Sequence, residues 1–463
     1  MAAILDRSHS IAGPGFSRWL VPPAALCIHL CIGQAYAFSV FNKPLAQLLC
    51  AAQNACPPAA AKVISTTPGD WTIANLGWIF SLAIVFLGLS AAVFGRWVES
   101  AGPRAAMFAS ASLFCGGLVV AGFGVNLHML PLVFLGYGVI GGCGLGIGYI
   151  SPVSTLIKWF PDRPGLATGT AIMGFGGGAL IGAPLAVALM KYYSSPTSNG
   201  VSLTMITMGV IYFIFMLVGV FLVRVPAPGW KPEGYVAPVT SAKMITTRNV
   251  LVGEAVKTPQ FWLLWAVLFL NVTAGFRILG QASLMVQDMF GAAVAAAAGF
   301  VGLLSLFNMG GRIFWASMSD FLGRKPTYMI FFGLGAILYA LIPWTKNVGS
   351  LAMFVAICCI ILTMYGGGFA TIPAYLRDMF GTVQVGAIHG VLLTAWSCAG
   401  VAGPVLVNYI RQYQLDHGVA KGDAYSVTMF ICAGLLVVGF ICNYLVKPLD
   451  ESHYVAVGAE AAT

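Results

Sequence analysis

The chain has 463 residues, of which 59% are hydrophobic and only 8% are charged, and its mean hydropathy is +0.89. Soluble domains carry about a quarter charged residues, so this composition excludes an ordinary soluble protein and indicates a membrane protein. The formal net charge of +9 does not indicate nucleic-acid binding, because the basic residues stand singly between apolar runs and not in a stripe with interleaved aromatic residues.

Twelve apolar runs are each long enough to cross a bilayer as a helix, which takes about 20 residues. The first run follows Arg7 and Arg18, as in a signal peptide, but no small-residue cleavage site ends a short apolar core, so we expect a retained helix. The sequence therefore predicts an all-α membrane protein. The twelve predicted spans are 20–42, 72–95, 105–124, 129–157, 166–190, 202–223, 259–286, 293–317, 326–344, 350–376, 387–409 and 425–446.

Basic residues between the spans indicate how the chain is oriented. With the N-terminus inside, 15 of the 23 Lys and Arg residues fall on the cytoplasmic side, six fall outside, and two, Arg277 and Arg312, lie within spans. Cytoplasmic loops of membrane proteins carry an excess of basic residues. We therefore expect both termini in the cytoplasm and the chain embedded in the lipid bilayer of the cell inner membrane.

Two long segments of the chain repeat each other. Acid, glycine and base recur after the second and eighth spans at an offset of 221 residues, and Gly165 and Gly386 recur at the same offset. A shared offset over separated blocks predicts two related halves of six helices, residues 1–223 and 258–463, joined by a polar linker at 224–257. The matched loop positions are Gly95, Glu99, Gly102 and Arg104 in the first copy, and Asp320, Gly323, Arg324 and Lys325 in the second.

These two loops resemble the G-x-x-x-[D/E]-x-x-G-x-[K/R] signature loop of the major facilitator superfamily. The resemblance implies the major facilitator fold and a transporter that is not an enzyme and uses no cofactor. Each acid can cap a helix end and form ion pairs across the cytoplasmic face, while glycine permits a tight turn. We expect the eight loop residues to form a conformational latch whose loss would favour the opposite conformation of the transporter.

Five further motifs, taken in order, resemble the oxalate/formate antiporter branch and the related monocarboxylate porters over nearly the whole chain. This resemblance implies a carrier for a small organic anion, working as an anion exchanger or as a proton symporter. An exporter of a neutral solute or drug is the alternative, although export of cationic drugs should require an embedded acid, and the predicted spans contain none. The motifs lie at 33–44, 158–169, 258–262, 308–320 and 365–373.

Arg312 is the main candidate for binding the substrate. It precedes Asp320 by eight residues, about 12 Å of helix, which places it well inside the membrane. A charge there is costly and should face the helix bundle. A planar guanidinium without an acid nearby in the sequence can bind a carboxylate through two parallel hydrogen bonds. In the family that the chain resembles, an arginine at this position of the motif, which also contains Asn308, binds the substrate carboxylate.

The resemblance to the oxalate-transporting members fails at Trp396, where they place a lysine in the eleventh span. One fixed cation suits a monoanion better than a dianion, so we favour a monocarboxylate, and an oxalate/formate-type dicarboxylate exchanger is the alternative. Four other aromatic residues match wall positions of the family's binding site, although packing alone would also explain each of them. They are Tyr36, Tyr149, Phe175 and Tyr365.

Other residues in or near the spans have simpler interpretations. Arg277 stands about 27 Å above the inner end of its span, near the outer interface, where we expect its side chain to snorkel towards water. We interpret His29 and His389 as buried packing residues. Cys50 and Cys56 share the long first outer loop, in an oxidising compartment, and could form a disulfide. No spacing of Cys and His indicates a metal site.

Overall fold

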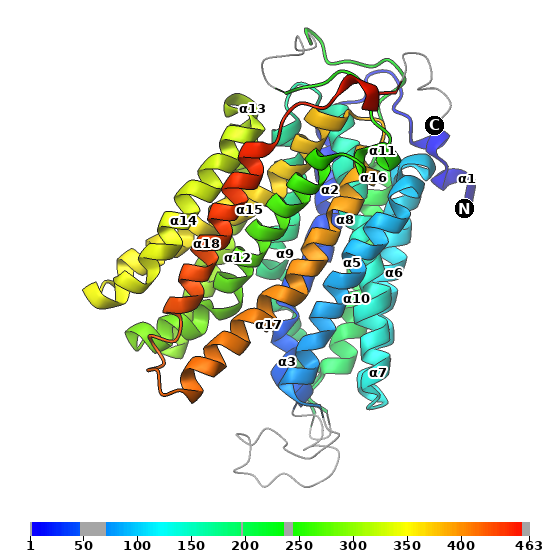
Figure 1. Ribbon diagram of the computed structural model, residues 1–463. Helices are drawn as coiled ribbons and strands as arrows, with labels where there is room; N and C mark the ends of the chain where they lie inside the picture. The colour runs from blue at the N-terminus through cyan, green and yellow to red at the C-terminus, as the bar shows by residue number, and fades with distance from the viewer. Residues whose placement is uncertain (1, 47–70, 196–197, 236–243, 456–463) are drawn as a thin grey trace.

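The computed structural model describes residues 2–46, 71–195, 198–235 and 244–455. Within these ranges the regular structure is helical, apart from two isolated β-bridges (Figure 1). Eleven helical segments of this part of the chain are long and apolar enough to cross a membrane. Helix α13 (Val294–Leu322), with 29 residues, runs among them and is the twelfth. The prediction of an all-α protein with twelve transmembrane helices is confirmed; the predicted Cys50–Cys56 disulfide lies outside the described residues.

The first six-helix segment contains two spans with irregular turns. The first span changes from α-helix to 3-10 helix at Gly33, and the fourth contains a π-helical stretch. Such departures from the α-helix often occur at functional sites. The elements are α1 (Ala2–Leu5), η1 (Arg7–Ser10), η2 (Arg18–Leu20), α2 (Val21–Ile32), η3 (Gly33–Ala37), α3 (Ser39–Ala46), α5 (Ile73–Ala101), α6 (Pro103–Asn126), α7 (Leu130–Val133), η4 (Phe134–Gly141), α8 (Gly142–Trp159), α9 (Pro164–Tyr193) and α10 (Val201–Leu222).

In the second six-helix segment, helices continue past the predicted ends of their spans. The seventh and tenth spans extend to Phe290 and Phe380, so Asp288 and Asp378, which lie outside the predicted spans, belong to the last helical turns. The eleventh span is divided into two helices at Leu393. The elements are α11 (Val252–Ala255), α12 (Pro259–Phe290), α13, α14 (Arg324–Val348), α15 (Leu351–Phe380), α16 (Val385–Leu392), α17 (Thr394–Asp416), α18 (Ser426–Leu445) and η5 (Glu451–His453).

Both ends of the described chain lie at the same end of the helix bundle (Figure 1). There the backbone of Ile11 pairs with Val225, and the Val455 N–H donates to the Asn249 carbonyl at 2.9 Å. We call this the inner end, because the basic residues predict that it faces the cytoplasm, and the opposite end the outer end. Figure 1 shows the two six-helix segments close together at the inner end and further apart at the outer end. The orientation and the division at 224–257 stay predictions.

Candidate functional site

Glu99 connects the two six-helix segments at the inner end. It stands in the last turn of α5, and its Oε1 accepts hydrogen bonds from the Gly386 N–H at 2.8 Å and from the Ser154 hydroxyl at 2.6 Å. Its other carboxylate oxygen forms an ion pair with Lys158. Gly386 lies in the first turn of α16, where free N–H groups and the helix dipole favour a negative charge. Glu99 therefore caps a helix of the other segment, and we call this contact the first latch.

Asp320 makes the equivalent connection in the opposite direction. From the last turn of α13, its Oδ1 accepts from the Gly165 N–H at 2.8 Å and its Oδ2 accepts from the Leu166 N–H at 2.9 Å. Both donors belong to the first turn of α9. The offset of 221 residues that relates Glu99 to Asp320 also relates Gly165 to Gly386. The sequence repeat is therefore also a repeat of contacts, and we call this the second latch.

A buried ion-pair network surrounds the second latch. Arg324 donates from Nη2 to Oδ1 of Asp320 at 2.6 Å and from Nε to Oδ2 of Asp378 at 2.9 Å. Arg377 donates from Nη1 to Oδ1 of Asp378 at 2.9 Å and from Nη2 to the Pro161 carbonyl, across the interface, at 3.3 Å. The sequence analysis did not include Asp378 or Arg377, because both stand beyond the predicted end of the tenth span.

Arg104 and Lys325 do not join the acids, although the sequence analysis grouped them with the latch. Arg104 donates to the Phe221 carbonyl at 3.5 Å, at the end of α10. Lys325 donates to the carbonyls of Tyr444 at 2.7 Å and Val446 at 2.8 Å, at the end of α18. A cation at a helix C-terminus pairs with free carbonyls and with the negative end of the dipole. Each base therefore stabilises the last helix of its own segment.

The three glycines of the predicted latch have geometric roles. Gly102 and Gly323 end α5 and α13 with φ angles of +86° and +92°, which side chains other than hydrogen rarely allow. Gly95 permits a close approach of α5 to α16, because a Cβ there would lie 2.7 Å from the Cα of Ala387. These glycines bring the acids to the helix ends that they cap.

Arg312 lies deep within α13 and is fully buried, as its sequence position predicts. Its Nη1 donates to the Ile172 carbonyl of α9 at 3.1 Å, and its Nε donates to Oδ1 of Asn308 at 3.4 Å. Its Nη2 has no hydrogen-bond partner. Within the described ranges, no Asp or Glu forms an ion pair with Arg312. The charge is therefore held by one carbonyl and one amide, with one edge left free.

Aromatic rings from both six-helix segments pack together beside this guanidinium. The ring of Phe175 lies 5.1 Å from that of Tyr36 and 5.3 Å from that of Tyr149, measured between centroids. Trp396, from α17, lies 5.4 Å from both Tyr149 and Phe175. Four of the five aromatic residues predicted for the site are thus in mutual contact, and Trp396 joins the two segments.

Tyr365 reaches the same group through Phe369, one turn further along α15. The Phe369 ring lies 5.2 Å from Tyr365 and 4.6 Å from Trp396, and the guanidinium carbon of Arg312 lies 5.5 Å from its centroid. The sequence analysis did not include Phe369. Its spacing of four residues from Tyr365 could have indicated it, because residues i and i+4 share a helix face.

Several buried hydrogen-bond donors in this group have no acceptor. The hydroxyls of Tyr36, Tyr149 and Tyr365 and the indole N–H of Trp396 make no hydrogen bond. All three hydroxyls are close enough to Arg312 to interact with its charge. Leaving a buried polar group unpaired costs about 1–3 kcal/mol. A cluster of unpaired donors around a cation therefore favours an anion with several acceptor oxygens.

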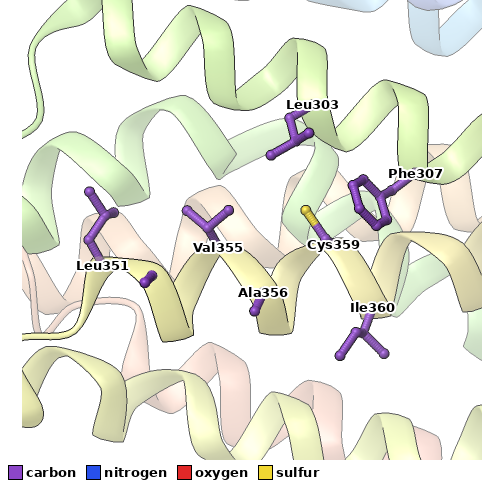
Figure 2. A pocket seen from close by; sticks show the side chains of 8 residues that line it. Leu303, Phe307, Leu351, Val355, Ala356, Cys359 and Ile360 are labelled. Carbon is purple, nitrogen blue, oxygen red and sulfur yellow. The ribbon is translucent and has the colours of Figure 1, made fainter.

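A separate groove of about 850 Å³ lies at the outer end, between α13 and α15 (Figure 2). Leu303 and Phe307 project into it from α13, and Leu351, Val355 and Ile360 project from α15. No charged side chain lines this groove, and Leu303, Phe307 and Ile360 are exposed on the surface of the bundle. Such a groove suits the acyl chains of lipid and has no group that would bind an anion.

Arg277 does not snorkel to the outer interface, and that prediction was wrong. Its side chain is only 1% exposed, and its guanidinium carbon lies 5.3 Å from the ring centroid of Tyr425. The physical reason is that α12 continues to Phe290, about 20 Å beyond Arg277, so neighbouring helices cover the side chain. His29 and His389 are buried, as their interpretation as packing residues requires.

Comparison with known proteins identifies the family. The family model of the Major Facilitator Superfamily matches residues 25–404, and the chain therefore belongs to this superfamily of transporters. The oxalate:formate antiporter of Oxalobacter formigenes is 30% identical over 334 residues, which are 72% of this chain and 75% of that protein. The apicoplast pyruvate carrier 1 of Toxoplasma gondii is 23% identical over 444 residues, covering 84% of this chain and 78% of that protein.

The solved structures agree on the fold. The crystal structure of the major facilitator transporter FucP in the outward conformation superposes with a TM-score of 0.63, covers 94% of this chain and 100% of that chain, and shares 14% of its sequence. The protein is thus a multi-span membrane protein with the major facilitator fold. Both resemblances stated from sequence motifs, to the superfamily and to the oxalate/formate and monocarboxylate branch, are confirmed.

Proposed function

We propose that this protein is a secondary active transporter that moves a small organic anion with one carboxylate across the inner membrane by alternating access. The observation that carries the proposal is the buried guanidinium of Arg312, with its free Nη2 and no acidic partner among the described residues. The names of two similar proteins, an oxalate:formate antiporter and a pyruvate carrier, support the same class of substrate.

In this proposal the carboxylate binds at the free edge of Arg312. The interactions of Nη1 and Nε with Ile172 and Asn308 orient the guanidinium and leave Nη2 available. A hydrogen bond to a charged group contributes about 1.5–3 kcal/mol. The free hydroxyls of Tyr36 and Tyr149 would donate to the second carboxylate oxygen, which relieves their unpaired state in the same step.

Trp396 supports a monoanion over a dianion. The indole is fully buried and stacks edge-on against Tyr149 and Phe175, so the wall of the site that it forms is apolar except for one N–H. A second carboxylate placed there would lose its hydration without gaining a cation. The substituent of the substrate at this wall is therefore hydrogen or a short apolar or hydroxylated group, as in formate, pyruvate or lactate.

The two latches support a transport cycle between two closed ends. In the described state the carboxylates of Glu99 and Asp320 hold the inner end together. Release of the substrate to the cytoplasm requires both caps to separate, while closure of the outer end occludes the site from outside. Exchange for a second anion, or movement of a proton with the substrate, would balance the transported charge.

The test is uptake by proteoliposomes containing the purified protein, with labelled formate, pyruvate, lactate and oxalate, each with and without a pH gradient or internal anion. We expect monocarboxylate uptake by the wild type. Arg312→Gln should lower it by about 100-fold or more, since two charged hydrogen bonds are lost, and Arg312→Lys should lower it less. Trp396→Lys should raise uptake of oxalate relative to formate.

Lys191→Gln is the matched control, because Lys191 is an exposed cation at the end of α9, away from the site. It should transport like the wild type. Undiminished monocarboxylate uptake by Arg312→Gln would remove the assignment of the site and leave the neutral-solute or drug exporter as the better hypothesis. A preference of the wild type for oxalate would favour the dicarboxylate exchanger.

A further inference from the structure

A second buried arginine has no counter-charge. Arg277 lies in α12 with only 1% of its side chain exposed, and none of its three guanidinium nitrogens has a hydrogen-bond partner. Arginine stays protonated in proteins. A buried charge without a partner is among the most costly features of a folded protein. Arg277 therefore needs a compensating group that the described residues do not supply.

The nearest acid is already occupied. Asp288 accepts hydrogen bonds at the same oxygen, Oδ2, from Nη2 of Arg411 at 3.0 Å and from the Tyr425 hydroxyl at 2.5 Å. It also stands 11 residues after Arg277 on the same helix, about 16 Å along the axis, which is beyond the reach of an arginine side chain. Asp288 therefore pairs with Arg411 and leaves Arg277 uncompensated.

The surroundings of Arg277 carry a net positive charge. The guanidinium carbons of Arg277 and Arg411 both lie 5.3 Å from the ring centroid of Tyr425. Two cations and the single acid Asp288 give this cluster a net charge of +1. One monovalent anion would neutralise the cluster, whereas a dianion would leave an excess negative charge.

The available space suits a very small anion. A cavity of about 10 Å³ lies between α12, α14, α15 and α18, lined in part by Ala274, Tyr339 and Leu436. Tyr339 also interacts with the charge of Arg277, so the cavity adjoins this cluster. Such a volume holds roughly one water molecule. A halide ion is similar in size, whereas a substrate with a carbon chain is larger.

The cluster is distinct from the site around Arg312. Arg312 faces the first six-helix segment through its bond to the Ile172 carbonyl. Arg277 instead faces α18 of its own segment, through Tyr425 at the start of that helix. The two cations share no contact residue among those named for either group.

We propose that Arg277, together with Arg411 and Tyr425, binds one small monovalent anion of the halide type, such as chloride, within the outer part of the second six-helix segment. The anion stabilises the packing of α12, α17 and α18 around the arginine. This inference is independent of the proposed function, because the site does not include Arg312 and does not require any particular substrate.

The test is thermal unfolding of the purified full-length protein, followed by intrinsic tryptophan fluorescence at constant ionic strength, in sodium chloride, sodium formate or sodium gluconate. Wild-type Tm should rise with chloride concentration and reach a plateau, whereas gluconate, which is too large, should give no rise. Binding to the native state raises stability in proportion to the logarithm of the free ligand concentration above Kd.

Arg277→Met should abolish the chloride-dependent rise and should be at least as stable as the wild type in gluconate, since no uncompensated charge remains. Arg411→Gln should raise the chloride concentration at half-saturation several-fold, because the net charge of the cluster falls to zero. Arg312→Gln should keep the chloride response. If Arg277→Met does not fold, Arg277→Lys replaces it, and it should weaken the response without abolishing it.

Formate separates two sources of the anion. A formate-dependent rise in Tm that is lost in Arg277→Met but kept in Arg312→Gln would support the site with a small carboxylate as an occupant. A formate response lost only in Arg312→Gln belongs to the substrate site and leaves the halide assignment in place. The proposal is overturned if chloride produces no rise in the wild type, or if Arg277→Met keeps the full response.

Discussion

The first and second latches occupy equivalent positions of the repeat but differ in their surroundings. In each, a carboxylate at the end of one helix caps the first turn of a helix in the other segment. Glu99 pairs with Lys158, whose side chain is 25% exposed. Asp320 pairs with Arg324, whose side chain is 7% exposed and which also binds Asp378. The shared geometry comes from the repeat, and the difference comes from the neighbours.

One pair of repeat positions explains much of this difference. Lys158 and Asp378 are 220 residues apart, at matching places in the two halves, but they carry opposite charges. In the first latch this position supplies the cation that pairs with the acid. In the second it supplies another acid, and the cations come from Arg324 and Arg377. Burial makes the loss of one charge more costly, so the second latch should be the more sensitive of the two.

The largest effect is expected from Asp320→Asn. Removing this charge leaves Arg324 buried with one partner fewer, and breaking a buried pair costs about 3–5 kcal/mol. Turnover in proteoliposomes should fall on the order of 100-fold, because the inner end closes less readily, while equilibrium binding of the substrate in detergent is unchanged. Intact turnover with binding abolished would contradict a role in the conformational cycle.

Glu99→Gln should have a smaller effect in the same direction. Lys158 remains partly in water when it loses its partner, so we expect a loss of about 1–2 kcal/mol and roughly a tenfold fall in turnover. The matched control is the double variant Glu99→Gln with Lys158→Met, which should be no worse than Glu99→Gln, since the pair is already broken. A Glu99→Gln defect equal to that of Asp320→Asn would show that burial of the partner does not decide the sensitivity.

Arg104→Gln should have the smallest effect. Arg104 contacts backbone carbonyls of its own segment, including Phe221, and neither acid. We expect a loss of stability of about 0.3–1 kcal/mol, as for a cation at a helix C-terminus, seen as a small decrease in Tm. The ratio of turnover to binding should match the wild type. A fall in turnover like that of Glu99→Gln would return Arg104 to the latch.

The sequence predicted the fold well because its signals are local or repeated. Apolar runs define the helices, and a fixed offset relates the two latches. Arg312 was found because a cation within an apolar run stands out by residue type alone. The family motifs also indicated Tyr36, Tyr149, Phe175, Tyr365 and Trp396, whose contacts follow from the fold.

What the sequence could not predict are contacts made by main-chain groups and by residues of distant helices. The bond from Arg312 to the Ile172 carbonyl involves a backbone oxygen, which any residue supplies, so no side-chain type indicates it. Asp378 and Arg377 were missed because helix α15 continues past its predicted end. Arg277 was misplaced because its burial depends on how neighbouring helices pack around α12, which hydropathy along one helix does not report.

The positions that receive the two carboxylates are glycines, and this limits how the inner end can vary. The donors at Gly165 and Gly386 are backbone N–H groups, so most side chains would preserve the chemistry of the caps. They would not preserve the spacing, since a Cβ at Gly165 would overlap the Ala316 carbonyl and a Cβ at Gly386 would overlap the Glu99 carboxylate. A single methyl group at either position would act as a wedge between the two segments and would hold the transporter open towards its inner side.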